Sequence, residues 1–81
     1  MIVEVKLFAL AKQLARCDTI RVDLPAGSNV ADLRREISQQ FPDLAELVRH
    51  ALFAVNTEYA DEDSPLPSGA EIACIPPVSG G

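Results

Sequence analysis

Hydrophobic and polar residues alternate over the first eight positions of the chain, and this period of two is typical of a β-strand with one buried face. One alternate set is apolar throughout and consists of Val3, Val5 and Leu7. The other set carries the charges of Glu4 and Lys6, and it also contains Ile2 and Phe8. We therefore predict a strand over residues 2–8 whose second face meets water. An aromatic residue at position 8 of that face is unusual for a monomer, unless it covers the sheet edge or turns inward at the strand end.

Later segments predict the remaining elements of a single domain that combines strands and helices. In order, these are a short helix over 9–16, a strand over 18–24, a main helix over about 29–41, a short helical segment over 42–51, a strand over 52–56, a very short strand at Tyr59 and a final strand over 71–75. In the final strand, Ile72 and Cys74 share one face. If that face is buried, Ile75 lies on the exposed one.

The main helix carries the clearest local signals. Ser28 or Asn29 is a favourable N-cap, and Asp32, three positions after Asn29, would complete a variant of the capping box with it. Proline at position 42 ends the helix, because its ring is incompatible with the helix interior. Apolar residues recur at helical spacing on one face, namely Val30, Leu33, Ile37 and Phe41. The acidic run 61–63 predicts a solvated loop, and Leu66 after it is expected to plug the core.

Composition narrows the class of protein. The chain has 81 residues, enough for one domain with a small core, and a net charge of −5. Lys and Arg form no stripe beyond Arg34-Arg35, so nucleic acid is a poor partner for this chain. No apolar run has membrane-spanning length and no secretory signal is visible, so we expect a cytoplasmic protein that binds no membrane. In that compartment Cys17 and Cys74 are expected to be free thiols rather than a disulfide.

The sequence does not contain a set of residues with the types and spacing of a catalytic or metal site. His50 is the single histidine, and the two cysteines do not have metal-ligand spacing. Cys17 lies between Arg16 and Asp18, whose opposite charges have opposing effects on thiolate formation. A phosphate-binding glycine loop and a nucleophile elbow are also missing. The sequence therefore predicts a chain that does not catalyse a reaction alone and binds no metal or cofactor.

The last six residues form a distinct segment after the predicted domain over 1–75. Two prolines favour a stiff, extended spacer, and two glycines remove side-chain bulk at the end of the sequence. The segment 76–81 spans roughly 20 Å when extended. Such a tail is suited to placing a carboxylate in another protein's narrow site, although a frayed chain end is the general alternative. Its residues are Pro76, Pro77, Val78, Ser79, Gly80 and Gly81.

This tail, the element order and several short segments together resemble the small subunit of molybdopterin synthase. The segments are Leu7-Phe8-Ala9, Val55-Asn56 and Ser68-Gly69-Ala70-Glu71-Ile72, followed by the tail itself, which is the most specific part. The resemblance covers essentially the whole chain. It implies an α+β fold of the ubiquitin-like β-grasp type, in which a mixed sheet curls around one main helix, with short additional helices.

The resemblance also implies a role as a sulfur carrier in molybdenum cofactor biosynthesis. A ubiquitin-activating-like adenylyltransferase would consume ATP to adenylate Gly81, and a sulfur-donating enzyme would convert the adenylate to a thiocarboxylate. The tail would enter the large subunit of the synthase and give its sulfur to cyclic pyranopterin monophosphate. The resemblance places the partner-binding residues at Phe8, Tyr59 and Ile75, in a heterotetramer with two central large subunits and one small subunit at each end.

Some positions depart from the family pattern and leave partner specificity open. Cys17 stands where glycine is frequent, Ala70 where an acidic residue is common, and Ile75 where an aromatic also occurs. One alternative is a sulfur carrier for thiamine, cysteine or tRNA thiolation, although thiamine carriers are typically shorter and lack the Pro-Pro-Val-Ser stalk. A ubiquitin-like modifier joined to lysines and a plain interaction domain are further alternatives.

Overall fold

The alternating residues at the start of the chain form β1 (Ile2–Leu7), and its three apolar positions are almost completely buried. The structure is a computed structural model that describes residues 1–77. A short helix α1 (Ala9–Ala15) leads to β2 (Thr19–Asp23), which pairs antiparallel with β1. The main helix α2 (Val30–Gln40) follows, and then the 3₁₀ turn η1 (Pro42–Leu44) and the helix α3 (Ala45–His50).

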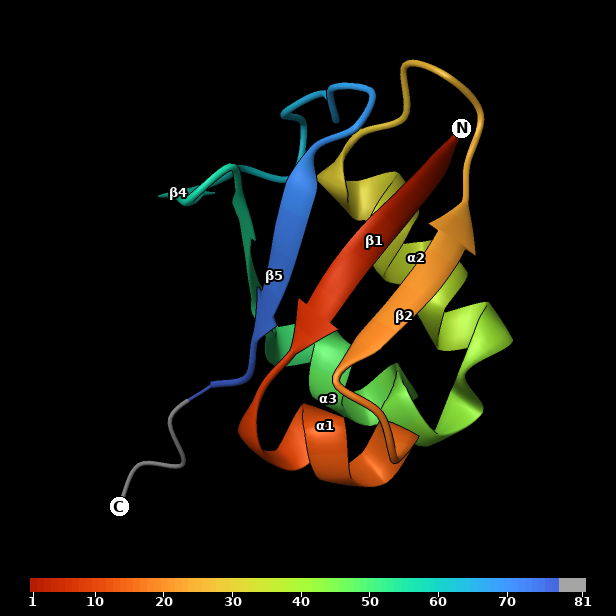
Figure 1. Cartoon of the computed structure of the whole chain (residues 1–81), viewed down its shortest axis with the longest axis vertical. Helices are drawn as coiled ribbons and strands as arrows, with labels where there is room; N and C mark the ends of the chain where they lie inside the picture. Colours follow the sequence, from red (N-terminus) through yellow and green to blue (C-terminus); the bar gives the residue numbers. More distant parts are fainter. Residues whose placement is uncertain (78–81) are drawn as a thin grey trace.

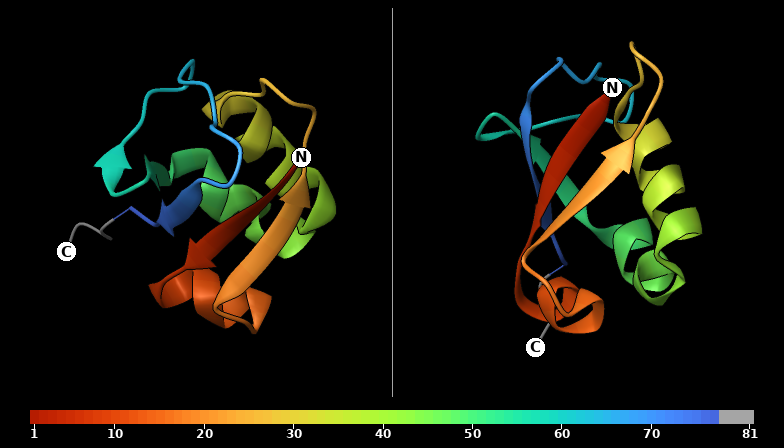
Figure 2. Two further views of the ribbon diagram at one scale, coloured as in Figure 1. Left: turned by 45° about the horizontal axis from the view of Figure 1, so that its top comes forward. Right: turned by 45° about the vertical axis from the view of Figure 1, so that its right-hand side comes forward.

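Three further strands complete a five-stranded mixed sheet. They are β3 (Leu52–Val55), β4 (Glu58–Tyr59) and β5 (Glu71–Ile75), and the strand order is β2-β1-β5-β3-β4. The pair β1–β5 is parallel, whereas β5–β3 and β3–β4 are antiparallel. The sheet curls around α2, which packs on one face of it (Figures 1 and 2). This arrangement confirms the predicted mixed sheet around one main helix.

The core lies between the sheet and α2. From α2 it receives Val30, Leu33 and Ile37, and from β5 it receives Ile72 and Cys74, all of them with no exposed surface. Leu66 is 3% exposed and fills the core from the loop before β5, as predicted. The capping box is confirmed, since the Asn29 side chain accepts a hydrogen bond from the Asp32 amide and the Asp32 carboxylate accepts one from the Asn29 amide.

The first strand is shorter than its sequence pattern predicts. β1 ends at Leu7, and Phe8 is the N-cap of α1 with an extended backbone (φ −128°, ψ 156°). The alternation therefore predicted the local geometry of residue 8 correctly, but this residue has no partner in the sheet ladder. In α1 only Ala11 is fully buried, while Leu10 and Leu14 are exposed.

The acidic loop over 61–63 is exposed and also forms hydrogen bonds to the main helix. Its backbone accepts hydrogen bonds from the start of α2, with Ala31 N–H bound to the Glu62 carbonyl at 3.0 Å and Val30 N–H to the Ser64 carbonyl at 3.2 Å. The Glu62 carboxylate also binds the Arg34 guanidinium through two hydrogen bonds. The prediction of a solvated run over 61–63 is confirmed, since all three residues are exposed. The loop also has a structural role that the sequence did not predict, because helices need acceptors for their first N–H groups and this loop supplies two.

The hairpin between β3 and β4 turns through two residues, Asn56 and Thr57. Both have positive φ angles, +50° and +73°, as the type I′ turn requires. The Asn56 side chain accepts a hydrogen bond from the Glu71 amide at 3.0 Å, and the Asn56 amide donates one to the Glu71 carbonyl at 2.8 Å. These two bonds fix the turn to the start of β5.

Candidate functional site

The base of the tail lies where β1 and β5 end side by side. Because these strands are parallel, with Leu7 opposite Cys74, the next residues Phe8 and Ile75 lie at the same end of the two strands. Phe8 is 48% exposed and Ile75 is half-buried. Both border an apolar groove together with Pro76 and Pro77. The structure thus brings two of the three predicted partner-binding residues to the base of the tail.

Tyr59 lies on the same face of the sheet but farther from the tail. It is 70% exposed on the edge strand β4 and pairs with Ala54, which in turn pairs with Ala73 of β5. Since paired residues of adjacent strands point to the same side, Tyr59 shares the open face with Ile75. It does not border the groove at the tail base.

One residue of this face was not singled out from the sequence. Leu52 pairs with Ile75 and is 56% exposed, so it joins Ile75 and Tyr59 around the small residues Ala54 and Ala73. We call these five residues the apolar half of the open face. The sequence could have indicated Leu52, because neighbouring residues of a strand point to opposite faces and the next residue, Phe53, is buried.

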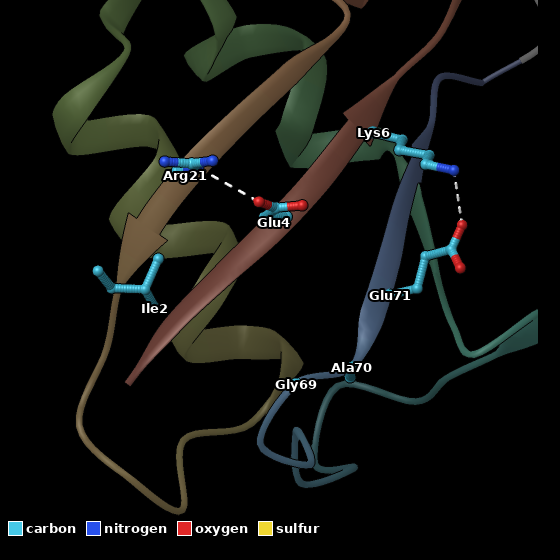
Figure 3. A pocket seen from close by; sticks show the side chains of 7 residues that line it. All are labelled: Ile2, Glu4, Lys6, Arg21, Gly69, Ala70 and Glu71. Atoms are coloured by element: carbon cyan, nitrogen blue, oxygen red, sulfur yellow. Dashed lines mark hydrogen bonds and ion pairs between the residues drawn. The ribbon is translucent and has the colours of Figure 1, made fainter.

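The other half of the open face is charged and is shown in Figure 3. Arg21 Nε lies 3.3 Å from Glu4 Oε1, and Lys6 Nζ lies 2.7 Å from Glu71 Oε1. The hydrogen bond and positive charge of Lys6 lower the pKa of Glu71, and the same contact raises the pKa of Lys6. All four side chains are exposed, and surface ion pairs contribute little to stability, so their main effect is to define a polar border beside the apolar half.

The thiols and the histidine lie apart from this surface. Cys74 is buried, and its burial raises the pKa of the thiol to about 11, with a weaker opposing effect from the Arg34 charge. Cys17 is exposed, and neither cysteine is in a disulfide. His50 is exposed on α3, with Nε2 3.7 Å from Glu46 Oε1. Within residues 1–77 no group of three or more acidic, histidine or cysteine side chains is arranged to hold a metal ion.

The tail itself is described only at its first two residues. Pro76 is half-buried and Pro77 is exposed, directly after the last residue of β5. The predicted tail residues Val78, Ser79, Gly80 and Gly81 lie outside the described residues. Over residues 1–77, no helix is long and apolar enough to cross a bilayer. The described part of the candidate site is therefore an exposed apolar face beside the base of the tail.

Comparisons with known proteins agree with this arrangement. The model of the ThiS family matches residues 5–81. The molybdopterin synthase sulfur carrier subunit of Dictyostelium discoideum is 38% identical over 81 residues, which are 96% of this chain and 94% of the relative. SAMP1 from Haloferax volcanii, a small archaeal modifier protein, has a similar structure with a TM-score of 0.85, 30% identity and full coverage of both chains.

A third similar protein was solved together with a partner. It belongs to a complex of subunits 1 and 2 of molybdopterin-converting factor from Helicobacter pylori, with a TM-score of 0.70, 29% identity and full coverage of both chains. These likenesses extend over the whole chain and include the predicted β-grasp fold. The chain therefore belongs to the ThiS family of ubiquitin-like β-grasp proteins, within which its curated relatives are sulfur carrier subunits of molybdopterin synthase.

Proposed function

We propose that this chain carries sulfur for molybdenum cofactor biosynthesis as the small, non-catalytic subunit of molybdopterin synthase. The observation that supports this most strongly is similarity over the whole chain to relatives that bear that name, at 32–38% identity. The structure adds a rigid domain whose last strand leads directly into the diproline at the start of the tail.

The reacting group in this proposal is the carboxyl of Gly81. An α-carboxyl is ionised at neutral pH, so one of its oxygens can attack the α-phosphorus of ATP, with pyrophosphate as the leaving group. A sulfide sulfur then attacks the carbonyl carbon of the acyl-adenylate, and AMP leaves. If the donor is a persulfide, the acyl disulfide formed first is cleaved by a thiol, which forms a disulfide with the donor's own sulfur. The product is a thiocarboxylate, which gives its sulfur to cyclic pyranopterin monophosphate. A partner adenylyltransferase consumes the ATP, and a separate enzyme supplies the sulfur.

The described residues contribute to this reaction by docking the domain. Phe8 and Ile75 lie beside Pro76, at the base of the tail, and Tyr59 extends the same apolar face across β4. The large subunit of molybdopterin synthase is the partner we propose for this face. The similar Helicobacter pylori protein, solved as a complex of subunit 1 with subunit 2, supports a partner of this class.

Intact-mass spectrometry provides the direct test. The chain is incubated with the activating enzyme, ATP and a sulfur source, and its mass is compared with that of a variant lacking Gly81. We expect one oxygen to be replaced by sulfur, located at Gly81 by fragmentation, and no change in the truncated variant. A variant with one residue appended after Gly81 should not support cofactor synthesis. Full activity of that variant without cleavage would contradict the proposal.

A second candidate function is protein modification, in which Gly81 is joined to lysine side chains of other proteins. The likeness to SAMP1 from Haloferax volcanii, with 30% identity and full coverage, favours this candidate specifically. Both functions begin with the same adenylate, so loading at Gly81 does not separate them. Conjugates that survive thiols and denaturant, and that disappear when Gly81 is deleted, would support the modifier function.

A further inference from the structure

An apolar groove between α1 and the η1–α3 segment is not explained by the folding of this domain. Its lining residues come from the turn after β1, from α1, from the η1–α3 segment and from the end of β5. These elements lie together at one end of the molecule (Figure 1). Its apolar walls include Leu10 and Leu14 from α1 and Leu47 from α3, and Phe8, Ile75 and Pro76 close its other side. The groove is therefore a surface distinct from the open face of the sheet, but the two meet at Ile75.

The two leucines of α1 face outward rather than into the core. Leu10 is 53% exposed and Leu14 is 39% exposed, whereas Ala11 between them has no exposed surface. The two leucines are four positions apart, so they lie one above the other on the same side of the helix. Single exposed leucines are common, but here they adjoin Leu47 and the tail base to form a contiguous apolar patch. Such patches mark interaction sites.

Two acidic side chains lie at the border of this groove. Asp43 is exposed and has no ion-pair partner within residues 1–77, and Glu46 is paired with Arg49 at 3.0 Å. The chain as a whole has a net charge of −5. The chemistry that fits the groove is therefore an apolar side chain flanked by lysine or arginine.

We propose that this groove is a second docking site for the large subunit of molybdopterin synthase, which inserts apolar side chains flanked by basic residues between α1 and α3. The inference rests on the proposed function and extends it. Pro76 and Pro77 line the groove, so a partner that takes the following residues into its active site must lie over the tail base and reach the groove. The groove is also continuous with the apolar half of the open face through Ile75.

The test measures binding of the large subunit by titration calorimetry. The double variant Leu10→Glu/Leu14→Glu should raise the dissociation constant by about tenfold or more, a typical loss of affinity when central apolar contacts are removed. Ile2→Glu is the matched control, because Ile2 is 62% exposed but lies on the charged half of the sheet. The control should bind within about twofold of the unmodified chain, since peripheral contacts are nearly neutral.

A charge variant makes the test independent of the leucines. Asp43→Lys alters an exposed residue that makes no ion pair in the described part of the chain, so it should fold normally and bind the large subunit more weakly, with a smaller dependence on salt. Melting temperatures check that each variant is folded. If the double glutamate variant does not fold, the Asp43→Lys result decides.

Adenylation by the activating enzyme, measured in parallel, separates the possible outcomes. Unchanged adenylation with weakened large-subunit binding supports the inference. Unchanged large-subunit binding in both variants overturns the inference. A loss of adenylation alone overturns it as well, because the groove would then bind the activating enzyme. If the unmodified chain itself does not bind the large subunit, the proposed function fails first and the inference fails with it.

Discussion

Arg34 of α2 and Glu62 of the loop before β5 are 28 residues apart and joined by two hydrogen bonds, Nε to Oε1 at 2.8 Å and Nη2 to Oε2 at 3.0 Å. The remaining guanidinium nitrogen donates to the carbonyls of Val48 and Ala51, the latter at 2.7 Å, where α3 ends. The guanidinium also lies 5.0 Å from the centre of the Phe53 ring. One side chain thus links the main helix, the end of α3, the acidic loop and β3.

Replacing Arg34 by lysine should therefore lower stability more than its surface position suggests. A lysine cannot reproduce the paired donors of the guanidinium, so we expect a loss of about 1–3 kcal/mol in the free energy of unfolding. Urea denaturation followed by circular dichroism measures this. Arg35→Lys is the control, because that side chain is 63% exposed and pairs only with Asp32 in the described residues. Equal midpoints for the two variants would contradict the structural role of Arg34.

The turn at Thr57 offers a stabilising change. Its φ of +73° is unfavourable for a β-branched residue but natural for glycine, and type I′ turns favour glycine at the second central position. Thr57→Gly should raise the free energy of unfolding by about 0.5–1 kcal/mol, because relief of strain exceeds the added entropy of the unfolded chain. Thr57→Ala keeps a Cβ and should gain less. A lower melting temperature for the glycine variant would show that the turn is not strained.

Phe8 should matter for binding and not for folding. It is 48% exposed and lies outside the core cluster, so Phe8→Glu should leave the melting temperature nearly unchanged. The same variant should weaken binding to the large subunit by about tenfold or more, since it places a charge in an apolar contact at the base of the tail. Calorimetry with the purified large subunit measures this. Unchanged affinity would remove Phe8 from the interface.

The two thiols should differ sharply in reactivity. Cys17 is exposed, whereas burial raises the pKa of Cys74 to about 11 and prevents access to it. Since the thiolate is the reactive species, iodoacetamide at pH 8 should alkylate Cys17 alone in the folded chain and both residues in urea. Peptide mapping by mass spectrometry identifies the modified site. Equal labelling of the two cysteines without denaturant would contradict the burial of Cys74.

The same raised pKa predicts how stability depends on pH. The folded chain holds the Cys74 proton more tightly than the unfolded chain, so this contribution is complete below a thiol's ordinary pKa and is lost as pH rises through the folded value. The free energy of unfolding should thus fall between about pH 9 and pH 11. Cys74→Ala should show a smaller decrease over that interval. Parallel curves for the two proteins would assign the decrease to other groups.

Local patterns predicted the strands and the main helix because each depends on neighbours two to four positions away. The capping pair Asn29 and Asp32 is an example, and the structure confirms it. The bond between Arg34 and Glu62 could not be predicted, because no periodicity relates residues 28 apart. Phe8 was assigned to the strand because it continues the alternation of residues 2–8. Its backbone is indeed extended, but only the tertiary pairing decides where a ladder ends.

The proposed docking surface was predictable only in part. Phe8 and Ile75 were identified through the family resemblance, and the parallel pairing of β1 with β5 explains why they lie together. Leu10 and Leu14 lie one turn apart in the predicted helix over 9–16, but a helix of two turns gives too few positions to show which side is buried. In the structure Ala11 is the fully buried residue of α1, which packs against η1, and the two leucines point outward.

The position of β5 between β1 and β3 also has a mechanical consequence. Its ladders to both neighbours run along its length, from Glu71 opposite Glu4 to Ile75 opposite Leu52. A pull on the chain end, with the body held still, would load these hydrogen bonds in shear, so that they resist together rather than opening one after another. If the tail is pulled out of a narrow channel in a partner protein, the force would therefore act on the whole domain. The domain would then dissociate in its folded state.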